Sequence, residues 1–280
     1  MIDLSLDEGE GCKAGWPLYA SPSSPLRMSK LTGIMACPAS VKFEDNESSQ
    51  AAETGSAVGR MIELYHLGAD IDEGVLRANF PLADLDRAGK LLDAYTLDPR
   101  NPKDAVVRES LEETVTAILE PHPLDRTGLP VVLIGHLDQV RVSDAGFYEI
   151  WDVKSGRKDR QLPRYAFQLH AYCEGYAQKY PDRKVRVGGI INLVGYEQTR
   201  MEGGERNAAT GRMRGAKKTE YAIGEHPVFL RSLARRSTHD LVLLEIRRTI
   251  ALIRMGQNAA VPGEWCSYCP GDEFPVCLEV

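Results

Sequence analysis

The fold is decided by residues 135–172, GHLDQVRVSDAGFYEIWDVKSGRKDRQLPRYAFQLHAY. Apolar residues alternate with polar ones over 131–142 and again over 147–153, and this period of two predicts two β-strands. The residues between them, SDAG at 143–146, predict a tight turn in which Gly146 takes the left-handed conformation. The sequence therefore predicts a β-hairpin.

The turn determines which residues of the hairpin face each other. A three-residue loop pairs Ser143 with Phe147 and, further along the strands, Asp138 with Asp152. Lys154 lies two residues after Asp152, so it projects from the same side of its strand. The hairpin thus predicts two carboxylates and an ammonium group in one place.

These three side chains suit a hard divalent cation. Asp138 and Asp152 are expected to hold Mg²⁺ or Mn²⁺, and Lys154 is expected to orient a water molecule or to help deprotonate it. Positive charge at this place would stabilise the negative charge that develops during phosphodiester hydrolysis. The alternative is a solvated strand face, which is the usual explanation of an aspartate and a lysine two residues apart.

Three motifs follow one another in this stretch: Gly135-x-x-Asp138, Asp152-x-Lys154 and Gln168-x-x-x-Tyr172. In this order they resemble the GxxD, (D/E)xK and QxxxY motifs of the PD-(D/E)xK nuclease superfamily, specifically its RecB-like branch. The resemblance implies an α/β fold of the restriction-endonuclease type, with an αβββαβ core and a mixed central sheet flanked by helices. The catalytic residues that it implies are Asp138, Asp152, Lys154, Gln168 and Tyr172.

Gln168 and Tyr172 also admit a structural interpretation. They lie one turn apart on the same face of a helix predicted over 160–180. Tyr165, Leu169 and Tyr172 form an ordinary apolar stripe, so packing is an alternative role for Tyr172, whereas Gln168 is expected to face the site.

The first long helix, predicted over 56–67, carries a fourth part of the resemblance. Family members have Gly-x-x-x-His-x-x-x-Glu here, and this chain has Gly55, Gly59 and Glu63. The resemblance implies Glu63 as a further metal or water ligand, and a boundary carboxylate is the alternative. Because Gly59 stands where the family commonly has a metal-binding histidine, a depleted metal shell is expected.

The remaining elements follow from periodicity and breaker residues. Residues 1–27 contain three prolines and predict an extended arm, while Ser29 is expected to cap a short helix that ends at Cys37. Residues 28–280 are expected to form a single nuclease domain. Its other predicted elements are a helix over 82–95, an extended segment over 105–118, a buried strand over 185–194 and a long helix over 227–255.

Composition sets the class of protein. The chain has 280 residues, 43% of them hydrophobic, which suffices for a sizeable core. Its apolar runs are too short to cross a bilayer and its first residues are acidic, unlike a signal peptide, so a cytoplasmic protein is expected. The net charge of −6 argues against a protein that coats nucleic acid, although a nuclease can confine positive charge to a groove.

Positive charge is concentrated next to the predicted site. Arg157, Lys158, Arg160 and Arg164 follow Lys154 and are expected to bind DNA phosphates. A second set of arginines and lysines lies in a glycine-rich, aperiodic segment over 200–218. This set either extends the DNA path or belongs to a solvated loop.

Four of the six cysteines form a second group, Cys37 near the start and Cys266, Cys269 and Cys277 at the end. C-x2-C spacing in a cytoplasmic protein indicates zinc or an iron–sulfur cluster, and unligated cysteines are the alternative. The resemblance favours a cluster, because several RecB-like nucleases, including AddB-type domains and the CRISPR adaptation nuclease, bind [4Fe-4S] with one cysteine before the core and three after it. Such a cluster would staple the two ends of the domain.

Together the motifs predict a Mg²⁺- or Mn²⁺-dependent deoxyribonuclease, and the resemblance favours an exonuclease acting on single strands or DNA ends. The alternative is a catalytically weak DNA-binding or recombination accessory protein of the same fold, because Gly59 lacks the expected ligand. The sequence has no helicase motif, so unwinding would require a partner helicase or recombination protein.

Overall fold

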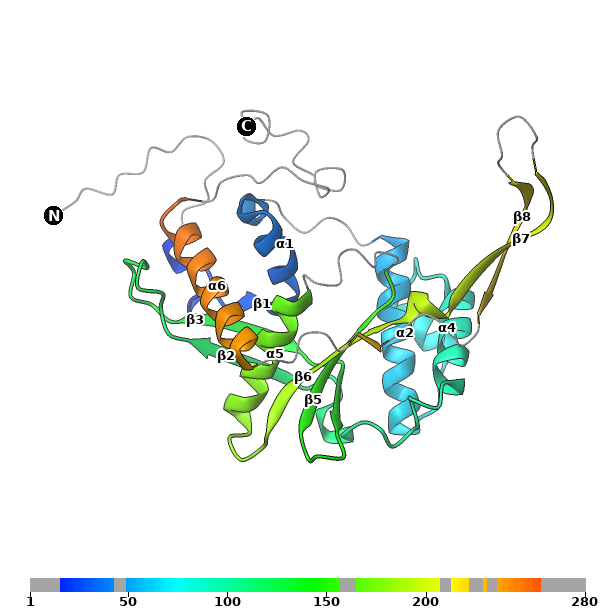
Figure 1. The fold of residues 1–280 in the computed structure, drawn as a ribbon, viewed down its shortest axis with the longest axis horizontal. Helices are drawn as coiled ribbons and strands as arrows, with labels where there is room; N and C mark the ends of the chain where they lie inside the picture. The colour runs from blue at the N-terminus through cyan, green and yellow to red at the C-terminus, as the bar shows by residue number, and fades with distance from the viewer. Residues whose placement is uncertain are drawn as a thin grey trace.

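A computed structural model describes residues 16–42, 49–156, 165–206, 213–221, 229–230 and 236–257 (Figure 1). The helices are α1 (Leu31–Ala36), α2 (Gln50–Leu67), α3 (Glu73–Asn79), α4 (Leu85–Leu97), α5 (Tyr165–Lys179) and α6 (Arg236–Arg254). The strands are β1 (Leu26–Arg27), β2 (Thr114–Leu119), β3 (Val131–His136), β4 (Gln139–Val142), β5 (Tyr148–Lys154), β6 (Val185–Asn192), β7 (Glu197–Arg206), β8 (Met213–Tyr221) and β9 (Phe229–Leu230). Sheets with parallel and antiparallel neighbours, flanked by helices, make this the predicted α/β fold.

A three-stranded sheet of order β1-β3-β2 carries the N-terminal part of the fold. β1 is parallel to β3, and β2 is antiparallel to it. The side chains of Ala20 and Leu26 are buried, so residues 16–27 pack into this layer. They are the C-terminal part of the predicted arm, and residues 1–15 lie outside the described ranges.

A four-stranded sheet of order β4-β5-β6-β9 occupies the centre of the molecule (Figure 1). β4 and β5 are antiparallel, whereas β5 and β6 are parallel and are connected through α5. Parallel neighbours require such a crossover, which explains why a helix follows the hairpin in the sequence.

The single strand predicted over 131–142 is instead two strands that belong to two sheets. β3 ends at His136 and β4 begins at Gln139, with the buried Leu137 at the junction. Alternation of polar and apolar residues continues across the junction and cannot reveal it. Asp138 therefore lies where the two sheets meet.

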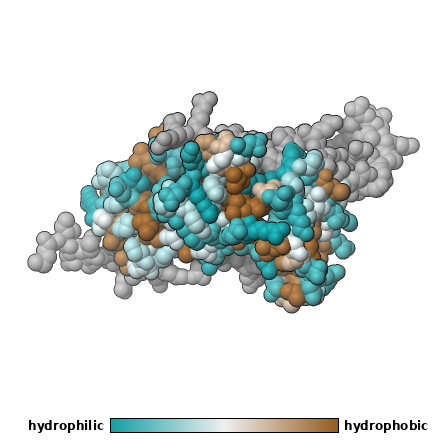
Figure 2. Space-filling model, turned by 90° about the horizontal axis from the view of Figure 1, so that it is seen from below, coloured by the Kyte–Doolittle hydropathy of each residue, from teal (hydrophilic) through white to brown (hydrophobic). Residues whose placement is uncertain are grey.

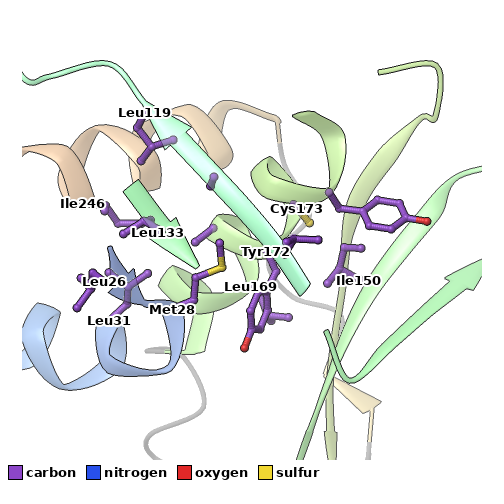
Figure 3. Packing of buried hydrophobic residues seen from close by; sticks show 14 of the residues in the cluster. Leu26, Met28, Leu31, Leu119, Leu133, Ile150, Leu169, Tyr172, Cys173 and Ile246 are labelled. Carbon is purple, nitrogen blue, oxygen red and sulfur yellow. The ribbon is translucent and has the colours of Figure 1, made fainter. Parts of the chain in front are cut away.

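Two apolar cores flank the central sheet. Side chains from α1, α5, α6 and the N-terminal strands converge in the first core, where Figure 3 shows Leu31, Leu133 and Ile246. The second core joins α2, α3 and α4 to the opposite face of β5 and β6. Ile150 belongs to the first core and Trp151 to the second, so the strand that leads to the predicted site is buried on both faces.

Several helix boundaries differ from the predicted ones. α2 begins at Gln50, where the hydroxyl of Ser49 caps it by accepting a hydrogen bond from the N–H of Ala52 (3.2 Å). α1 has no side-chain cap, so the prediction of Ser29 in that role is wrong. Helix α3, capped by Asp72, has no counterpart among the predicted elements because its seven residues give little periodicity.

The segment after β6 also differs from expectation. β7 and β8 form an antiparallel hairpin that extends away from the rest of the molecule in Figure 1, where an aperiodic segment is predicted over 200–218. An irregularity between Glu202 and Glu205 interrupts the pairing, and glycines there obscure the strand pattern. β9 occupies 229–230, within the predicted long helix, and α6 begins only at Arg236.

The surface gives no sign of a large apolar face in the view of Figure 2, where hydrophilic and hydrophobic residues are interspersed. Among the helices of the described ranges, none combines the length and hydropathy needed to cross a membrane.

Candidate active site

The β4–β5 hairpin has the predicted turn. The N–H of Ser143 donates to the carbonyl of Phe147 (2.9 Å), and Gly146 adopts a left-handed conformation with a φ of 73°. An L side chain is disfavoured in that conformation, which is why a glycine closes the loop.

The register of this hairpin brings two carboxylates together. The last pair of the ladder is Gln139 with Trp151, and the same register continued by one residue sets Asp138 opposite Asp152. The N–H of Val153 donates to Oδ2 of Asp138 (2.7 Å), which fixes this carboxylate against the end of β5. The predicted pairing of the two aspartates is therefore what the backbone register produces.

A β-bulge precedes Asp152. The register of β5 against β6 shifts between Ile150 and Trp151, and Gly188 is the extra residue on β6. A Cβ at position 188 would lie 2.3 Å from Nε1 of Trp151, so only glycine allows the indole to lie across the strand. The buried Trp151 thus anchors the backbone immediately before Asp152.

Water has little access to Asp152, whereas Asp138 is half-buried. Asp152 is 1% exposed. Burial raises the pKa of Asp152 to about 7, with Lys154 opposing the shift and Asp138 adding to it. Burial also raises the pKa of Asp138, against the opposing effects of Lys154 and the Val153 N–H. Two carboxylates this close ionise together only at a cost, so the pair holds a proton or needs a cation.

Lys154 is the third member of the site. Its Nζ lies 2.9 Å from Oδ1 and 2.7 Å from Oδ2 of Asp152, and 5.0 Å from the ring centre of Tyr165. Burial lowers the pKa of Lys154, but the carboxylates of Asp152 and Asp138 outweigh this effect and the pKa is raised. Lys154 is therefore a fixed positive charge at the site.

α5 brings Gln168 and Tyr172 to the same place. Nε2 of Gln168 donates to the hydroxyl of Tyr172 (2.7 Å) and lies 3.5 Å from Oδ1 of Asp152. A Cβ at position 135 would lie 2.5 Å from the Tyr172 ring, so Gly135 of the first motif makes room for the tyrosine of the third. Tyr172 combines packing with a contact to the site. Its ring packs beside Met28 and Leu169 (Figure 3), while its hydroxyl accepts a hydrogen bond from Gln168.

α2 lies along the site with its two glycines. A Cβ at Gly55 would lie 2.5 Å from Oγ of Ser155, so the helix approaches the end of β5 closely. A Cβ at Gly59 would meet no atom within 4 Å. Glu63, two turns along the same face, is ion-paired with Arg60, and no direct contact joins it to the aspartate pair among the described interactions.

Arg87 on α4 is a further residue that supports the site. It donates to the carbonyl of Ser155 (3.3 Å) and to the carboxylate of Glu197 (2.6 Å), so it ties the end of β5 to the start of β7. No local pattern in the sequence marks it, because its partners are distant along the chain.

The donor set fits a divalent cation. Of the two contacts between Lys154 and Asp152, only that to Oδ1 has hydrogen-bond geometry, and the buried Oδ2 accepts no hydrogen bond. Such an oxygen beside a second carboxylate is a suitable ligand for a hard cation. Within the described ranges no three His, Cys, Asp or Glu side chains are placed together as a metal site, so other ligands would come from backbone, water or substrate.

Of the other predicted site residues, only Cys37 lies within the described part of the chain. Arg157, Lys158, Arg160 and Arg164 lie outside the described residues, as do Cys266, Cys269 and Cys277. Cys37 ends α1, where its N–H donates to the carbonyl of Gly33 (2.9 Å).

Comparison with known families agrees with this geometry. The family model of the PD-(D/E)XK nuclease superfamily matches residues 27–274. The chain belongs to the PD-(D/E)XK nuclease superfamily. Members of this superfamily are nucleases that hydrolyse phosphodiester bonds, and the match spans the whole site from Gly55 to Tyr172. No protein of curated function matches the sequence. Among solved structures, this chain is similar to the crystal structure of SSO0001. The sequence identity is 13% and the TM-score is 0.37, and the match covers 90% of this chain and 86% of that one.

Proposed function

We propose that the protein is a Mg²⁺- or Mn²⁺-dependent deoxyribonuclease of the RecB-like type, which acts as an exonuclease on single strands or DNA ends. The observation that carries the proposal is the convergence of Asp138, Asp152 and Lys154 at the end of one hairpin. A protein that only binds DNA gains nothing from burying two carboxylates beside each other, since this costs stability.

Each residue has a distinct role in this proposal. A divalent cation, when bound, would polarise the phosphoryl group of the substrate and lower the pKa of a bound water molecule. Asp138 and Asp152 would hold the cation, together with the backbone carbonyl that follows Asp152. The ammonium of Lys154 stabilises negative charge on the phosphate.

The outer part of the site is assigned to helices. Gln168 orients Asp152 and is itself bonded to Tyr172, so both catalytic assignments on α5 are supported by contacts. Glu63 is assigned a water-mediated role, because its carboxylate is ion-paired with Arg60 and makes no direct contact with the two aspartates among the described residues.

The proposal extends to DNA and to a second metal centre. Arg157, Lys158, Arg160 and Arg164 would bind DNA phosphates, and their position in the chain directly after the site supports this. A [4Fe-4S] cluster held by Cys37, Cys266, Cys269 and Cys277 would join the ends of the domain, with zinc as the alternative metal. A helicase or recombination protein is the proposed partner.

One observation favours a second function. Gly59 offers no ligand where the family commonly has histidine, and this supports a catalytically weak DNA-binding or recombination accessory protein. The retained aspartates and lysine favour the enzyme.

Digestion of end-labelled DNA tests these alternatives. Purified protein is incubated with linear and with circular DNA, with Mn²⁺ and with EDTA. Loss of the linear form alone, and only with Mn²⁺, is the expected result for an exonuclease. Loss of both forms would indicate an endonuclease, and DNA binding without cleavage at any metal concentration would favour the accessory protein.

A further inference from the structure

Tyr165 lies against the reaction centre, although the sequence predicts for it only a place in an apolar stripe. It begins α5, and the Nζ of Lys154 lies over its ring, 5.0 Å from the ring centre. The ring is half-buried and packs against the first core, which limits its movement. The ammonium of Lys154 therefore has an aromatic neighbour as well as the carboxylate of Asp152.

The face of α5 that carries the third motif also places Tyr165. Tyr165, Gln168 and Tyr172 follow the i, i+3 and i+4 spacing of neighbours on one side of a helix. The amide of Gln168 lies 3.5 Å from Oδ1 of Asp152 and donates to the hydroxyl of Tyr172. The ring of Tyr165, one turn earlier, lies at Lys154. Successive turns of α5 thus contact the carboxylate and the ammonium of the site.

A carboxylate and an aromatic ring hold an ammonium in different ways. Asp152 opposes the charge of Lys154 and accepts one of its N–H groups (2.9 Å). The ring of Tyr165 attracts the same charge through its quadrupole but does not neutralise it. An ammonium has three N–H groups, so contact with a ring leaves donors for a phosphate oxygen. The side chain of Lys154 is 23% exposed, which allows a phosphate to approach it.

The contact with the ring gains importance when a cation binds. Oδ2 of Asp152 lies 2.7 Å from Nζ of Lys154, and the same carboxylate would be a ligand of the cation. The cation would repel the ammonium and weaken its attraction to Asp152. Tyr165 offers Lys154 a neighbour that does not compete for the metal.

We infer that Tyr165 is a positioning residue, whose ring holds the Lys154 ammonium where it can donate to the substrate phosphate. This inference rests on the proposed function. The face of the ring carries the role, and the hydroxyl does not. Phenylalanine can therefore replace Tyr165, whereas an aliphatic residue cannot.

The kinetics of DNA cleavage in Mn²⁺ test this role. Tyr165→Leu should lower kcat about 10-fold, as expected for loss of a cation–π contact, with little change in KM. Tyr165→Phe should keep the wild-type kcat. Phe167→Leu is the matched control, because Phe167 is another half-buried ring on the same turn of α5 that packs against the first core, and its loss should leave kcat unchanged. Near-ultraviolet circular dichroism confirms that each variant is folded.

A second measurement follows the contact itself and needs no cleavage. In protein labelled with ¹³C-lysine, nuclear magnetic resonance detects the ε-methylene group of Lys154, which is assigned as the signal missing in Lys154→Arg. The ring current of Tyr165 should shift this signal upfield, because the end of the lysine lies over the ring. The shift should persist in Tyr165→Phe and disappear in Tyr165→Leu.

The outcomes separate this inference from the proposed function. If Tyr165→Leu cleaves with the wild-type kcat while Lys154→Ala is inactive, the nuclease stands and the role of Tyr165 is refuted. A raised KM at unchanged kcat would also refute it, because the ring would then act in substrate binding. An equal loss of kcat in Tyr165→Phe, or a Lys154 signal without the upfield shift, would overturn the role of the ring. If wild type cleaves no DNA at any Mn²⁺ concentration, the nuclease function and the role of Tyr165 are both refuted.

Discussion

Two ionised carboxylates buried side by side lower the free energy of unfolding unless a proton or a bound cation neutralises part of their charge. The folded-state pKa of Asp152 is raised to about 7 from 3.8, so between these values the folded protein holds a proton that the unfolded chain has lost. Stability therefore falls as the pH rises through this window. The shift corresponds to at most on the order of 4 kcal/mol.

We expect Asp152→Asn to stabilise the protein in EDTA at pH 8 and to have little effect near pH 4. Thermal unfolding across this pH range measures the difference, and Asp93→Asn on the exposed face of α4 is the control. Added Mg²⁺ should raise the Tm of wild type but not of Asp152→Asn, because only the former binds it. Equal pH dependence in the two proteins would contradict the raised pKa of Asp152.

Lys154 and Asp138 should be required for cleavage and dispensable for DNA affinity. Lys154→Ala removes a positive charge from the reacting phosphate, and Asp138→Ala removes a metal ligand, so each should lower the cleavage rate by about two orders of magnitude or more. Binding of DNA, measured by fluorescence anisotropy, should change little, because arginine and lysine side chains outside the site provide most of the nonspecific affinity.

Lys184→Ala, at an exposed position away from the site, controls for the loss of one positive charge. Wild-type cleavage by Lys154→Ala would place the active site elsewhere.

Position 59 has room for the side chain that the family commonly has there. A Cβ meets nothing within 4 Å, and Gly55 on the same face lies against Ser155 at the end of β5. Gly59→His should therefore lower the Mn²⁺ concentration for half-maximal cleavage, provided that wild type cleaves. The control is Gly59→Ala, which adds a side chain without a ligand. An unchanged midpoint in folded Gly59→His would show that position 59 does not face the cation.

At the scale of elements, a buried polar network holds α2 and α4 against the hairpin. Nδ1 of His66 lies 3.0 Å from the carbonyl of Lys103, and Nε2 lies 2.9 Å from the hydroxyl of Tyr95. Since a carbonyl only accepts, Nδ1 carries the hydrogen and Nε2 accepts from Tyr95. Gln139 and Arg141 on β4 donate to the same tyrosine (2.9 and 3.2 Å). The helix that carries Gly59 is thus linked to the strand that follows Asp138.

Protonation of His66 would break this network. Burial lowers the pKa of His66, the Lys103 carbonyl opposes the shift, and Arg141 and Arg108 add to it. Below about pH 6.5 the unfolded chain takes up a proton that the folded protein resists, so stability is lost as the pH falls.

We expect the free energy of unfolding to decrease more between pH 7.5 and 5.5 in wild type than in His66→Gln. Urea denaturation measures it at each pH. Since Asp152 is common to both proteins, its opposite pH dependence cancels in the difference. His136→Gln, at an exposed position, should behave as wild type, and an identical slope for His66→Gln would refute the prediction.

The sequence predicts the hairpin well because its determinants are local. Gly146 and the alternation around it specify the turn, and the turn sets Asp138 against Asp152. The junction at Leu137 and the hairpin of β7 and β8 are not predictable in this way, since both depend on which sheet a segment joins.

At the scale of the whole molecule, the family resemblance and not periodicity predicts that α2, the hairpin and α5 meet. The close approaches at Gly55, Gly135 and Gly188 show how the sequence permits this: each glycine lies where a neighbouring side chain leaves no room for a Cβ. Arg87 links β5 to β7 across distant parts of the chain, and no motif announces it.

The last prediction concerns the ends of the chain. The backbone of Cys37 is held by two hydrogen bonds: its N–H donates to the carbonyl of Gly33, and its carbonyl accepts from the N–H of Ser40 (both 2.9 Å). We expect anaerobically purified protein to be brown and to contain iron and labile sulfide, with Cys37, Cys266, Cys269 and Cys277 as ligands. Replacing any of these by Ala should remove the iron and lower the Tm, because the cluster would join segments that are distant in sequence.

Cys173 provides the control for this prediction. It is buried in the apolar core on α5, and burial raises the pKa of its thiol, so we do not expect it to be a metal ligand. Cys173→Ala should therefore keep its iron even where a cavity lowers its Tm, whereas Cys37→Ala should lose both. Iron content thus distinguishes a lost ligand from a merely weakened core. Stoichiometric zinc without iron in the anaerobic preparation would rule out the cluster and leave the four cysteines as a zinc site.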